Sequence, residues 1–290
     1  MPSLHRSRIN DALYEIHKDI AKPLSAAYLA KVSAYSEAHF HRVFKQVVGE
    51  SVHQYVRRVR MEFAANQLMF DGEANVDEIA QKCGFSSLSS FSRAFKATFH
   101  ETPGQWRQSS ENHRVPLSFR LDEDKARHYQ VQVQTPLPRP SVVFTQPQMM
   151  AYVRHRGYDR GIRQAWHQLL EWAEQEQRSV TTQIGLHHSN PAWVALEHCH
   201  YVACIAIDKP VRVRGQVNQL IIPGGRHAVF HLAGKYGDML PKIGQILSQW
   251  LPQSGFKLAA TPAYACYQTN HFTDPDERFE LDFYLPITGY

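Results

Sequence analysis

Residues 79–96 read IAQKCGFSSLSSFSRAFK, and residues 29–45 carry the same pattern in LAKVSAYSEAHFHRVFK. The two copies are offset by 50 residues before a turn and by 51 residues after it, so one residue is inserted in the second copy. Self-similarity at a fixed offset indicates that one supersecondary unit is present twice.

Each copy is predicted to fold as a helix, a tight turn and a second helix. Within the second helices, Phe40 and Phe44, and likewise Phe91 and Phe95, recur four residues apart and define a buried face. Gly84 suits the turn of the second copy because glycine tolerates positive φ. We expect an N-cap at Ser36 before the second helix of the first copy, and one in Asn75-Val76-Asp77-Glu78 before the first helix of the second copy.

The opposite face of each second helix is polar and basic, as a helix that enters the DNA major groove requires. In the first copy this face carries Glu37, Ala38, His41, Arg42 and Lys45. In the second copy it carries Ser87, Leu88, Ser89, Arg93 and Lys96. Both arginines can donate to guanine or to phosphate, and the sequence does not separate these uses.

A helix predicted from His53 to about Phe70 joins the copies and would be about 27 Å long. It carries Arg57, Arg58 and Arg60, and of these we add Arg57 to the candidate DNA contacts. Such a spacer can hold two recognition helices near one turn of DNA apart, ~34 Å. The alternative is a pair of plain helical hairpins. In residues 1–112 Lys and Arg exceed Asp and Glu by only two, so the placement of cations at 42, 45, 57, 58, 93 and 96 carries the argument.

The segment Phe85-Ser-Ser-Leu-Ser-Ser-Phe91-Ser-Arg93-Ala-Phe95-Lys96, followed by Thr102-Pro103 and Trp106-Arg107, resembles the signature of AraC/XylS-family transcription regulators. The resemblance covers about residues 8–108. It implies two helix-turn-helix subdomains in adjacent major grooves of double-stranded DNA. It also implies regulation of transcription, often activation through contact with RNA polymerase.

A second repeat, with an offset of 78 residues, relates Tyr158 to Tyr236, Trp172 to Trp250 and Tyr201 to Phe279. Two different repeat periods predict two domains. We expect a DNA-binding domain at 1–110, a linker at 111–127 and a second domain at 128–290, whose first strand would lie at Tyr129–Val133.

The second domain is predicted to be α+β, with two βαββ halves related by a pseudo-twofold axis. The expected strands are 149–155, 194–196 and 201–207 in the first half and 228–232, 264–267 and 279–285 in the second, with helices at 162–176 and 240–251. The halves would form one curved antiparallel sheet with helices on one face. The other face would be concave and would hold a small ligand.

Aromatic residues and one carboxylate are the candidate ligand contacts in this domain: Trp193, Tyr201, Tyr236, Phe279, Phe283 and Glu280. Rings of this kind stack on flat apolar molecules or on cations. Glu280 interrupts an apolar strand and can face an organic cation. Because strand residues alternate between faces, it can equally be a solvated residue on the outer face.

Ordered marks in residues 140–288, including His155-Arg156-Gly157-Tyr158 and Pro223-Gly224-Gly225, resemble the GyrI-like effector-binding domain family. The resemblance implies binding of hydrophobic, often cationic, compounds, and small-molecule hydrolysis in some members. Ala265 stands where many members carry Glu, which puts the cation site and Glu-based hydrolysis in doubt. The order of the two domains resembles that of Rob-type regulators.

Several other classes are excluded by the sequence. No P-loop, G-x-S-x-G or HExxH motif is present, so we predict no enzyme activity and no cofactor. The cluster at His198, Cys199, His200 and Cys204 fits no closed zinc pattern, so no metal is expected, and the pair His187-His188 is expected in a loop. No apolar run approaches the ~20 residues of a membrane span, and the cysteines suggest a reduced, cytoplasmic protein.

The resulting hypothesis is a sequence-specific transcription regulator, most simply an activator, controlled by a hydrophobic or cationic small molecule. The alternatives are a second domain that binds a protein partner and one that hydrolyses a small molecule.

Overall fold

The computed structural model describes residues 2–71, 73–112, 136–191, 193–211, 216–259 and 261–289. The chain divides into two compact units, which are Met1–Asn112 with Val211–Asn218 and His113–Pro210 with Gln219–Tyr290. Most of the predicted linker and the strand predicted at 129–133 lie outside the described residues. The domain limits derived from the sequence therefore stay predictions.

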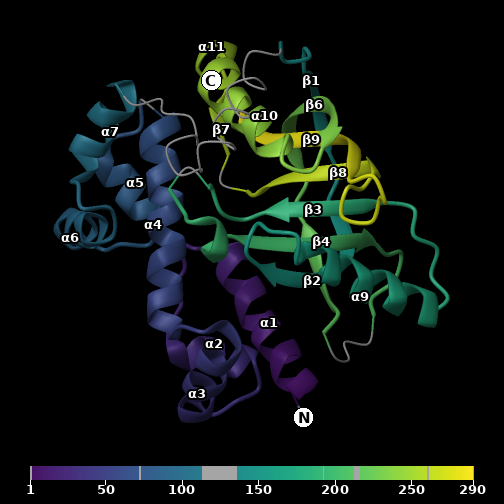
Figure 1. The fold of residues 1–290 in the computed structure, drawn as a ribbon. Coiled ribbons are helices and arrows are strands. Elements are labelled where there is room, and N and C mark those ends of the chain that lie inside the picture. Colours follow the sequence, from purple (N-terminus) through teal and green to yellow (C-terminus); the bar gives the residue numbers. More distant parts are fainter. Residues whose placement is uncertain are drawn as a thin grey trace. The chain divides into compact units, whose positions relative to one another are not determined.

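The described residues of the first unit are helical, and the helices are α1 (Pro2–Lys18), α2 (Ala26–Val32), α3 (Glu37–Val48), α4 (Val52–Phe70), α5 (Val76–Lys82), α6 (Leu88–Phe99) and α7 (Pro103–Asn112). Helices α2 to α6 confirm the prediction of two helical pairs joined by a long helix, whereas α1 and α7 were not predicted. In Figure 1, α2 and α3 lie near one end of α4, and α5, α6 and α7 pack along its other half.

Local signals account for the helix starts. Asn75 caps α5 in a capping box, because its side chain accepts from the Glu78 N–H while the Glu78 carboxylate accepts from the Asn75 N–H. Ser51 caps α4 in the same way with Gln54. Ser36 occupies the N-cap position of α3 but makes no side-chain cap hydrogen bond.

The two turns use different residues for one backbone shape. Gly84 has φ +72°, and a Cβ there would lie 2.6 Å from Arg60 Nη2 and 2.7 Å from the Ala21 carbonyl oxygen. Ala34 in the first copy adopts φ 53°, a conformation that costs an L-residue about 1 kcal/mol or more. Both turns therefore contain a residue with positive φ, although only the second copy uses glycine for it.

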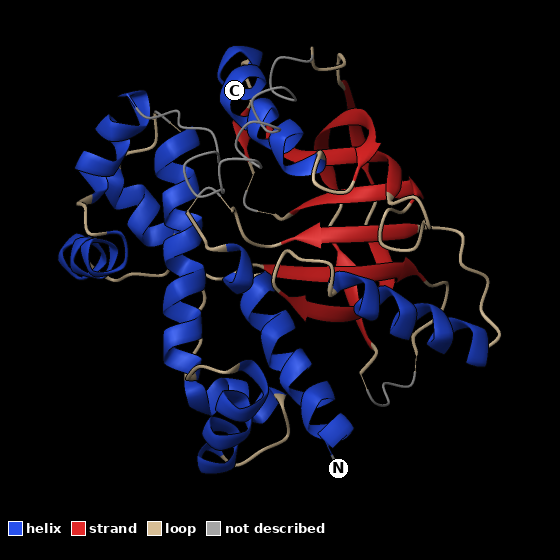
Figure 2. Ribbon diagram, viewed as in Figure 1, coloured by secondary structure: helices blue, strands red, loops and turns tan. Residues whose placement is uncertain are grey.

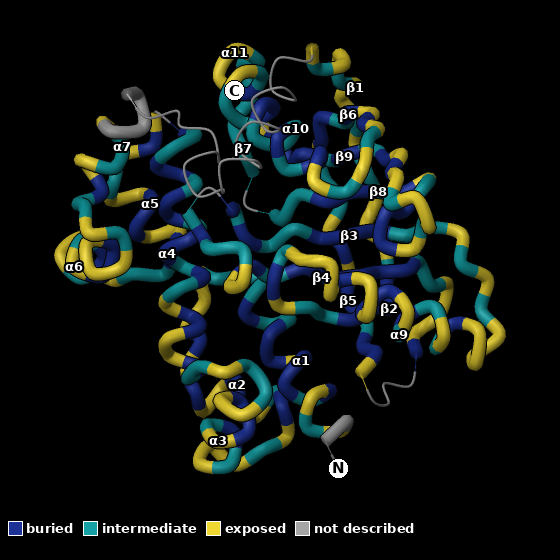
Figure 3. The backbone as a smooth tube through the Cα atoms, in the orientation of Figure 1, coloured by how far each residue is buried: buried dark blue, intermediate teal, exposed yellow. Residues whose placement is uncertain are grey.

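The predicted inner faces form the core of this unit. Phe40, Phe44, Phe91 and Phe95 are fully buried, and Figure 3 shows the buried inner sides of the helices in dark blue. Phe99 is half-buried and packs on Trp106 of α7, with ring centroids 4.7 Å apart.

The second unit is a sheet with helices, drawn in red and blue in Figure 2. Its first half contains β1 (Ser141–Thr145), β2 (Gln148–Arg156), α9 (Ile162–Gln175), β3 (Gln183–His187), the short 3-10 helix η2 (Leu196–His198) and β4 (His200–Ala206). Its second half contains β5 (Asn218–Ile222), β6 (Gly225–Lys235), α10 (Met239–Gln245), the π-helix η3 (Ile246–Trp250), α11 (Leu251–Ser254), β7 (Lys257–Leu258), β8 (Ala263–Thr269) and β9 (Arg278–Thr288).

The sheet runs in the order β1-β6-β9-β8-β3-β4-β2-β5, with β7 added on β9. Strands β3 and β8 pair antiparallel at its centre, with Gly185 opposite Ala265. From this central pair outward, the strands are β8, β9, β6 and β1 on one side and β3, β4, β2 and β5 on the other. β1 pairs with β6 and β5 with β2, so each of these two outer strands pairs with a strand of the other half. The pseudo-twofold relation remains a prediction that this strand order supports.

Two details differ from the prediction. Each half begins with an additional short strand, β1 or β5, which the sequence pattern did not show. Residues 194–196, expected as a strand, form loop and the start of η2, and the strand of that half lies instead at Gln183–His187. His187 therefore ends a strand and is not a loop residue. Gly185 interrupted the apolar pattern of this strand and hid it.

Candidate functional site

Helix α3 presents the predicted polar face to solvent. Glu37, Ala38, Arg42 and Lys45 are exposed, whereas Phe40 and Phe44 on the other side are buried. His41 is half-buried, lies 3.9 Å from the Glu37 carboxylate and packs its ring 5.5 Å from the ring of His53. The side chains of Arg42 and Lys45 therefore extend from a helix that is fixed by its phenylalanines.

Helix α6 has the same division but a different chemistry. Leu88, Ser89, Arg93 and Lys96 are exposed, and Leu88 is an apolar side chain with 43% exposure in the first turn. The Ser87 hydroxyl caps the helix by accepting from the Ser90 N–H, so Ser87 has a structural role besides any contact with DNA. Arg93 makes a long hydrogen bond, 3.4 Å, to the Ser89 carbonyl and leaves the end of its guanidinium outside.

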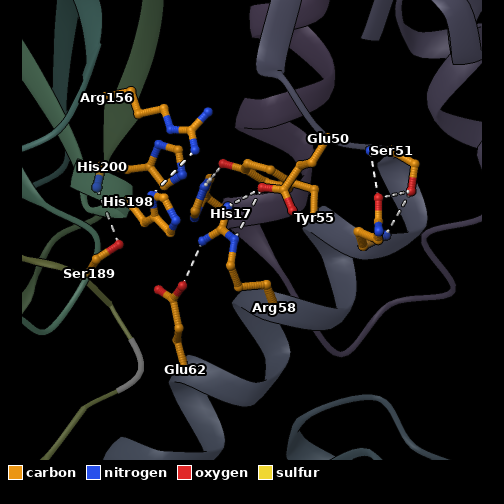
Figure 4. A network of polar contacts seen from close by, with 11 residues as sticks. His17, Glu50, Ser51, Tyr55, Arg58, Glu62, Arg156, Ser189, His198 and His200 are labelled. Atoms are coloured by element: carbon orange, nitrogen blue, oxygen red, sulfur yellow. Dashed lines mark hydrogen bonds and ion pairs between the residues drawn. The ribbon is translucent and has the colours of Figure 1, made fainter. Parts of the chain in front are cut away.

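The arginines of α4 divide between two roles. Arg57 is exposed and reaches the carbonyl of Ala94 on α6 at 3.5 Å. Arg58, which the sequence placed with the DNA-facing cations, donates to Glu50 at 2.8 Å and to Glu62 at 2.6 Å (Figure 4). Its guanidinium also lies over the Tyr55 ring, 4.8 Å from the centroid.

The placement of Arg58 among the DNA-facing cations was thus wrong. Glu62 is buried, and its negative charge together with that of Glu50 requires a cation on the same side of α4. The negative neighbours raise the pKa of Arg58, against the effect of burial. Arg60 is likewise occupied, since it donates to the carbonyls of Ile20 and Lys22.

In the second unit, four of the six predicted ligand contacts meet in one group of rings. We define the aromatic cluster as Tyr158, His187, Tyr201, Tyr236, Tyr267, His271, Phe272, Phe279 and Phe283. His187 lies 5.4 Å from Tyr201 and 6.5 Å from Phe283 between ring centroids. His271 lies 5.4 Å from Phe279 and 5.9 Å from Tyr236.

A hydrogen-bonded chain fixes the middle of the cluster. Trp166 of α9 donates through Nε1 to the Tyr201 hydroxyl at 3.2 Å, and the hydroxyls of Tyr201 and Tyr267 lie 3.2 Å apart. Burial raises the pKa of Tyr201 well above its usual range, so the phenol stays protonated and can donate. Gly185 makes this position possible, because a Cβ there would collide with the Tyr201 hydroxyl.

The cluster lies on the face of the sheet that the helices cover. Trp166 belongs to α9, and Trp250 packs edge-on against Phe230, the strand partner of Phe283. Partners in an antiparallel pair point to the same side. The expectation that the ligand candidates occupy the face opposite the helices was therefore wrong for Tyr201, Phe279 and Phe283. Large apolar side chains on strands are what an amphipathic helix packs against.

The two remaining candidates lie elsewhere. Glu280 alternates with Phe279 and Leu281, is exposed, and lies 3.5 Å from His231 on the opposite face of the sheet. Glu280 thus lies on the face where the ligand was expected, opposite the helices, but it is exposed there and separate from the aromatic cluster. Trp193 lies in the loop before η2, where its backbone N–H donates to the Asn190 carbonyl.

Sequence reasoning missed His187 and His271, the polar members of the cluster. Both ring nitrogens of His187 are enclosed without a hydrogen-bond partner, and so is Nδ1 of His271. Burial lowers the pKa of His187 to about 3 and that of His271 to about 4, so both imidazoles are neutral near pH 7. The only sequence signal was the alternation in Gln183–His187, which puts His187 on the same face as Gly185.

The histidine and cysteine motif of the sequence does not come together. His198 Nδ1 lies 3.4 Å from Arg156 Nη2, and the backbone N–H of His200 donates to the Ser189 hydroxyl (Figure 4). Across the described ranges, no group of three His, Cys, Asp or Glu side chains could hold a metal ion. Nor does any helix in that part of the chain have the length and apolarity to cross a membrane.

Comparison with known proteins finds relatives that match somewhat more than a third of the chain. The chain is 36% identical over 101 residues to the probable transcriptional regulator LumQ of Photobacterium leiognathi, covering 34% of this chain and 40% of LumQ. It is 33% identical over 110 residues to the transcriptional regulator AlkR of Acinetobacter baylyi, covering 38% and 36%. It is 36% identical over 103 residues to the transcriptional regulator Rob of Salmonella typhimurium, covering 36% and 35%. The chain thus spans well under half the length of these relatives.

Two family models match the chain in different places. A helix-turn-helix domain model matches residues 29–109, which contain the second half of α2, all of α3 to α6 and most of α7. The GyrI-like small molecule binding domain matches residues 138–288, about half of the chain, and includes the aromatic cluster. The chain therefore belongs to the GyrI-like small molecule binding family, with an AraC-type helix-turn-helix domain in front of the GyrI-like domain.

Proposed function

We propose that the chain is a sequence-specific DNA-binding regulator of transcription, and that its GyrI-like domain binds a small molecule that changes its regulatory output. The observation that carries the DNA part is the repeated division of α3 and α6. In each helix two phenylalanines are buried while an arginine and a lysine, Arg42 with Lys45 and Arg93 with Lys96, are exposed.

The geometry of the helical unit supports binding in two adjacent major grooves. Helix α4 has 19 residues and so spans about 28 Å, with α3 and α6 packed on its two halves. Two recognition helices about 34 Å apart would enter successive grooves on one side of the duplex. The exposed side chains differ between α3 and α6, so we infer an asymmetric site.

The chemistry of the two helices assigns their contacts. Arg42 and Arg93 would read guanine or bind phosphate, and Lys45, Lys96 and Arg57 would bind phosphate. Leu88 would make an apolar contact with a base, of the kind that a thymine methyl offers. The three relatives named above are transcriptional regulators, which favours this function over catalysis. Activation through contact with RNA polymerase is part of the proposal.

The test is a selection of random duplexes with the full chain, followed by affinity measurements on the selected site. We expect Arg42→Ala and Arg93→Ala each to weaken binding about tenfold or more, since a good base contact contributes about 1–3 kcal/mol. Lys18→Ala is the matched control, because it removes an exposed cation of α1 and should change little. Failure to enrich any sequence, or equal effects of all three substitutions, would exclude sequence-specific reading by these helices.

The effector part is tested with a reporter driven by the selected site. A compound that binds the full chain should change transcription or DNA affinity, and it should do neither with a chain truncated after residue 112 that still binds the site. If transcription and DNA affinity stay unchanged across a broad panel of compounds, the chain is a DNA-binding protein that is not controlled by a small molecule.

A further inference from the structure

The aromatic cluster contains polar atoms that the protein itself does not satisfy. Nδ1 and Nε2 of His187 and Nδ1 of His271 are enclosed and have no hydrogen-bond partner. Buried nitrogens without partners are rare, because each loses its hydrogen bonds to water on folding. An enclosed imidazole between rings, with both nitrogens free, is prepared for a partner that comes from outside the chain.

The surrounding side chains define which partner fits. Tyr158, Tyr201 and Phe283 flank His187, so a ligand that reaches it must be largely aromatic or apolar. His187 is neutral, and a neutral imidazole has one N–H donor and one acceptor nitrogen. A hydroxyl group can donate to the acceptor or accept from the donor, whereas a methyl group in the same position can do neither.

A cation is disfavoured by the charges at the edge of the cluster. Glu277, the carboxylate next to His271, accepts from Arg160 at 2.8 and 2.9 Å and lies 3.3 Å from Arg163. Arg160 also covers the ring of Tyr236, with its Cζ 4.3 Å from the centroid. The carboxylate and one ring face that could hold a cationic ligand are therefore already occupied by arginines.

The same arginines border an open part of the surface. Arg160 and Arg163 line a hollow along α9 together with Gln164, His167 and Glu171. Tyr236 is half-buried and follows the end of β6, and His271 and Phe272 belong to the turn after β8. Loop side chains move more readily than strand side chains. A ligand would therefore enter the cluster by displacing Tyr236, His271 and Phe272, while the strands stay in place.

We propose that the aromatic cluster binds an uncharged aromatic compound that carries a hydroxyl group, and that His187 forms the hydrogen bond to this hydroxyl. His271 provides a second polar contact at the edge of the site. This inference rests on the proposed function, since it names the ligand class of the GyrI-like domain.

The experiment compares ligands that differ in one group. Calorimetric titration of the full chain would use 2-naphthol, 2-methylnaphthalene and trimethyl(2-naphthyl)ammonium, and the same three groups on benzene and on biphenyl to vary the size. Since one hydrogen bond contributes about a tenfold change in Kd, the best hydroxyl compound should bind about tenfold more tightly than its methyl counterpart. The ammonium compound should bind most weakly.

His187→Phe keeps a ring of similar shape and removes both nitrogens. It should reduce the affinity for the hydroxyl compound about tenfold, leave the affinity for the methyl compound unchanged, and raise the Tm of the free protein. A residue with a purely structural role would lower the Tm and affect both ligands alike. His231→Phe, at an exposed residue on the opposite face of the sheet, is the matched control and should change neither affinity.

The inference is overturned if an ammonium compound or a methyl compound binds as tightly as the hydroxyl compound of the same ring, or if no hydroxyl compound binds below millimolar concentration. Neither comparison needs a variant that folds. Preferential binding of the ammonium compound would overturn this inference and leave an effector-controlled regulator intact. Binding of the hydroxyl compound without any effect on DNA affinity or on transcription would support this inference and would contradict control of the regulator by an effector.

Discussion

Gly185→Ala is the substitution whose cost the sheet determines most directly. Gly185 lies between Ala203 of β4 and Ala265 of β8. An added Cβ would collide with the Tyr201 hydroxyl and would lie 2.8 Å from its Cζ. Tyr201 is buried, so it must rotate within a packed core and lose its contacts with Trp166 and Tyr267.

Two contributions set the magnitude. Each of the two hydrogen bonds contributes about 1 kcal/mol, and a hydroxyl left without partners adds a similar penalty. The unfolding free energy should therefore fall by about 2–4 kcal/mol, with a decrease of roughly 5–15 °C in the Tm of this unit. Gly104→Ala is the matched control, since a Cβ there meets nothing within 4 Å and alanine favours the helix, so stability should stay equal or rise slightly.

Urea unfolding followed by tryptophan fluorescence suits this comparison, because Trp106 is the only one of the five tryptophans outside the second unit. The double variant Gly185→Ala/Tyr201→Phe removes the colliding hydroxyl. Its loss should be clearly smaller than the sum of the two single losses. A Gly185→Ala protein as stable as the wild type, or strictly additive losses, would refute the close approach of Tyr201 to this strand.

Three further outcomes follow from the structure. Arg58→Ala should destabilise the first unit by about 1–3 kcal/mol in thermal unfolding, because it leaves Glu62 buried without its cation, and Arg58→Ala/Glu62→Gln should recover part of the loss. Ala34→Gly should raise the unfolding free energy by about 1 kcal/mol, since its φ of 53° suits glycine, and an unchanged value would show that the turn is not strained. As pH falls below about 6.5, His187 and His271 become protonated in the unfolded chain, whereas in the folded chain they stay neutral until about pH 3–4. The unfolding free energy should therefore fall by up to about 2 kcal/mol per histidine at pH 5 and should level off below pH 3. His187→Phe should remove its share of this slope, and an identical pH dependence of the two proteins would contradict a neutral, buried His187.

The helical unit was predictable because its signals are local. The capping box at Asn75, the turn glycine at Gly84 and the paired phenylalanines each act within a few residues, and they agree with one another. Arg58 could not be assigned in this way. Its partners are Glu50, eight residues away, and Glu62, four residues away, and whether they compete with DNA depends on which side of α4 packs inward.

The sheet unit shows the opposite situation. Four rings of the aromatic cluster, those of Tyr201, Tyr236, Phe279 and Phe283, were named from the sequence. The face that the strand residues share depends on the register of β3, β4, β8 and β9, which only the fold provides. Glu280 looked informative because it breaks an apolar strand, yet alternation places it outside. His187 was missed because Gly185, the residue that makes room for Tyr201, also breaks the pattern that reveals its strand.

Hydroxyl-radical footprinting of the full chain on its selected duplex tests the central claim most directly. Two recognition helices held by α4 predict two protected patches on one side of the duplex, about 10 base pairs apart. Arg42→Ala should weaken one patch and Arg93→Ala the other. A single protected patch, or loss of the same patch in both variants, would contradict the account.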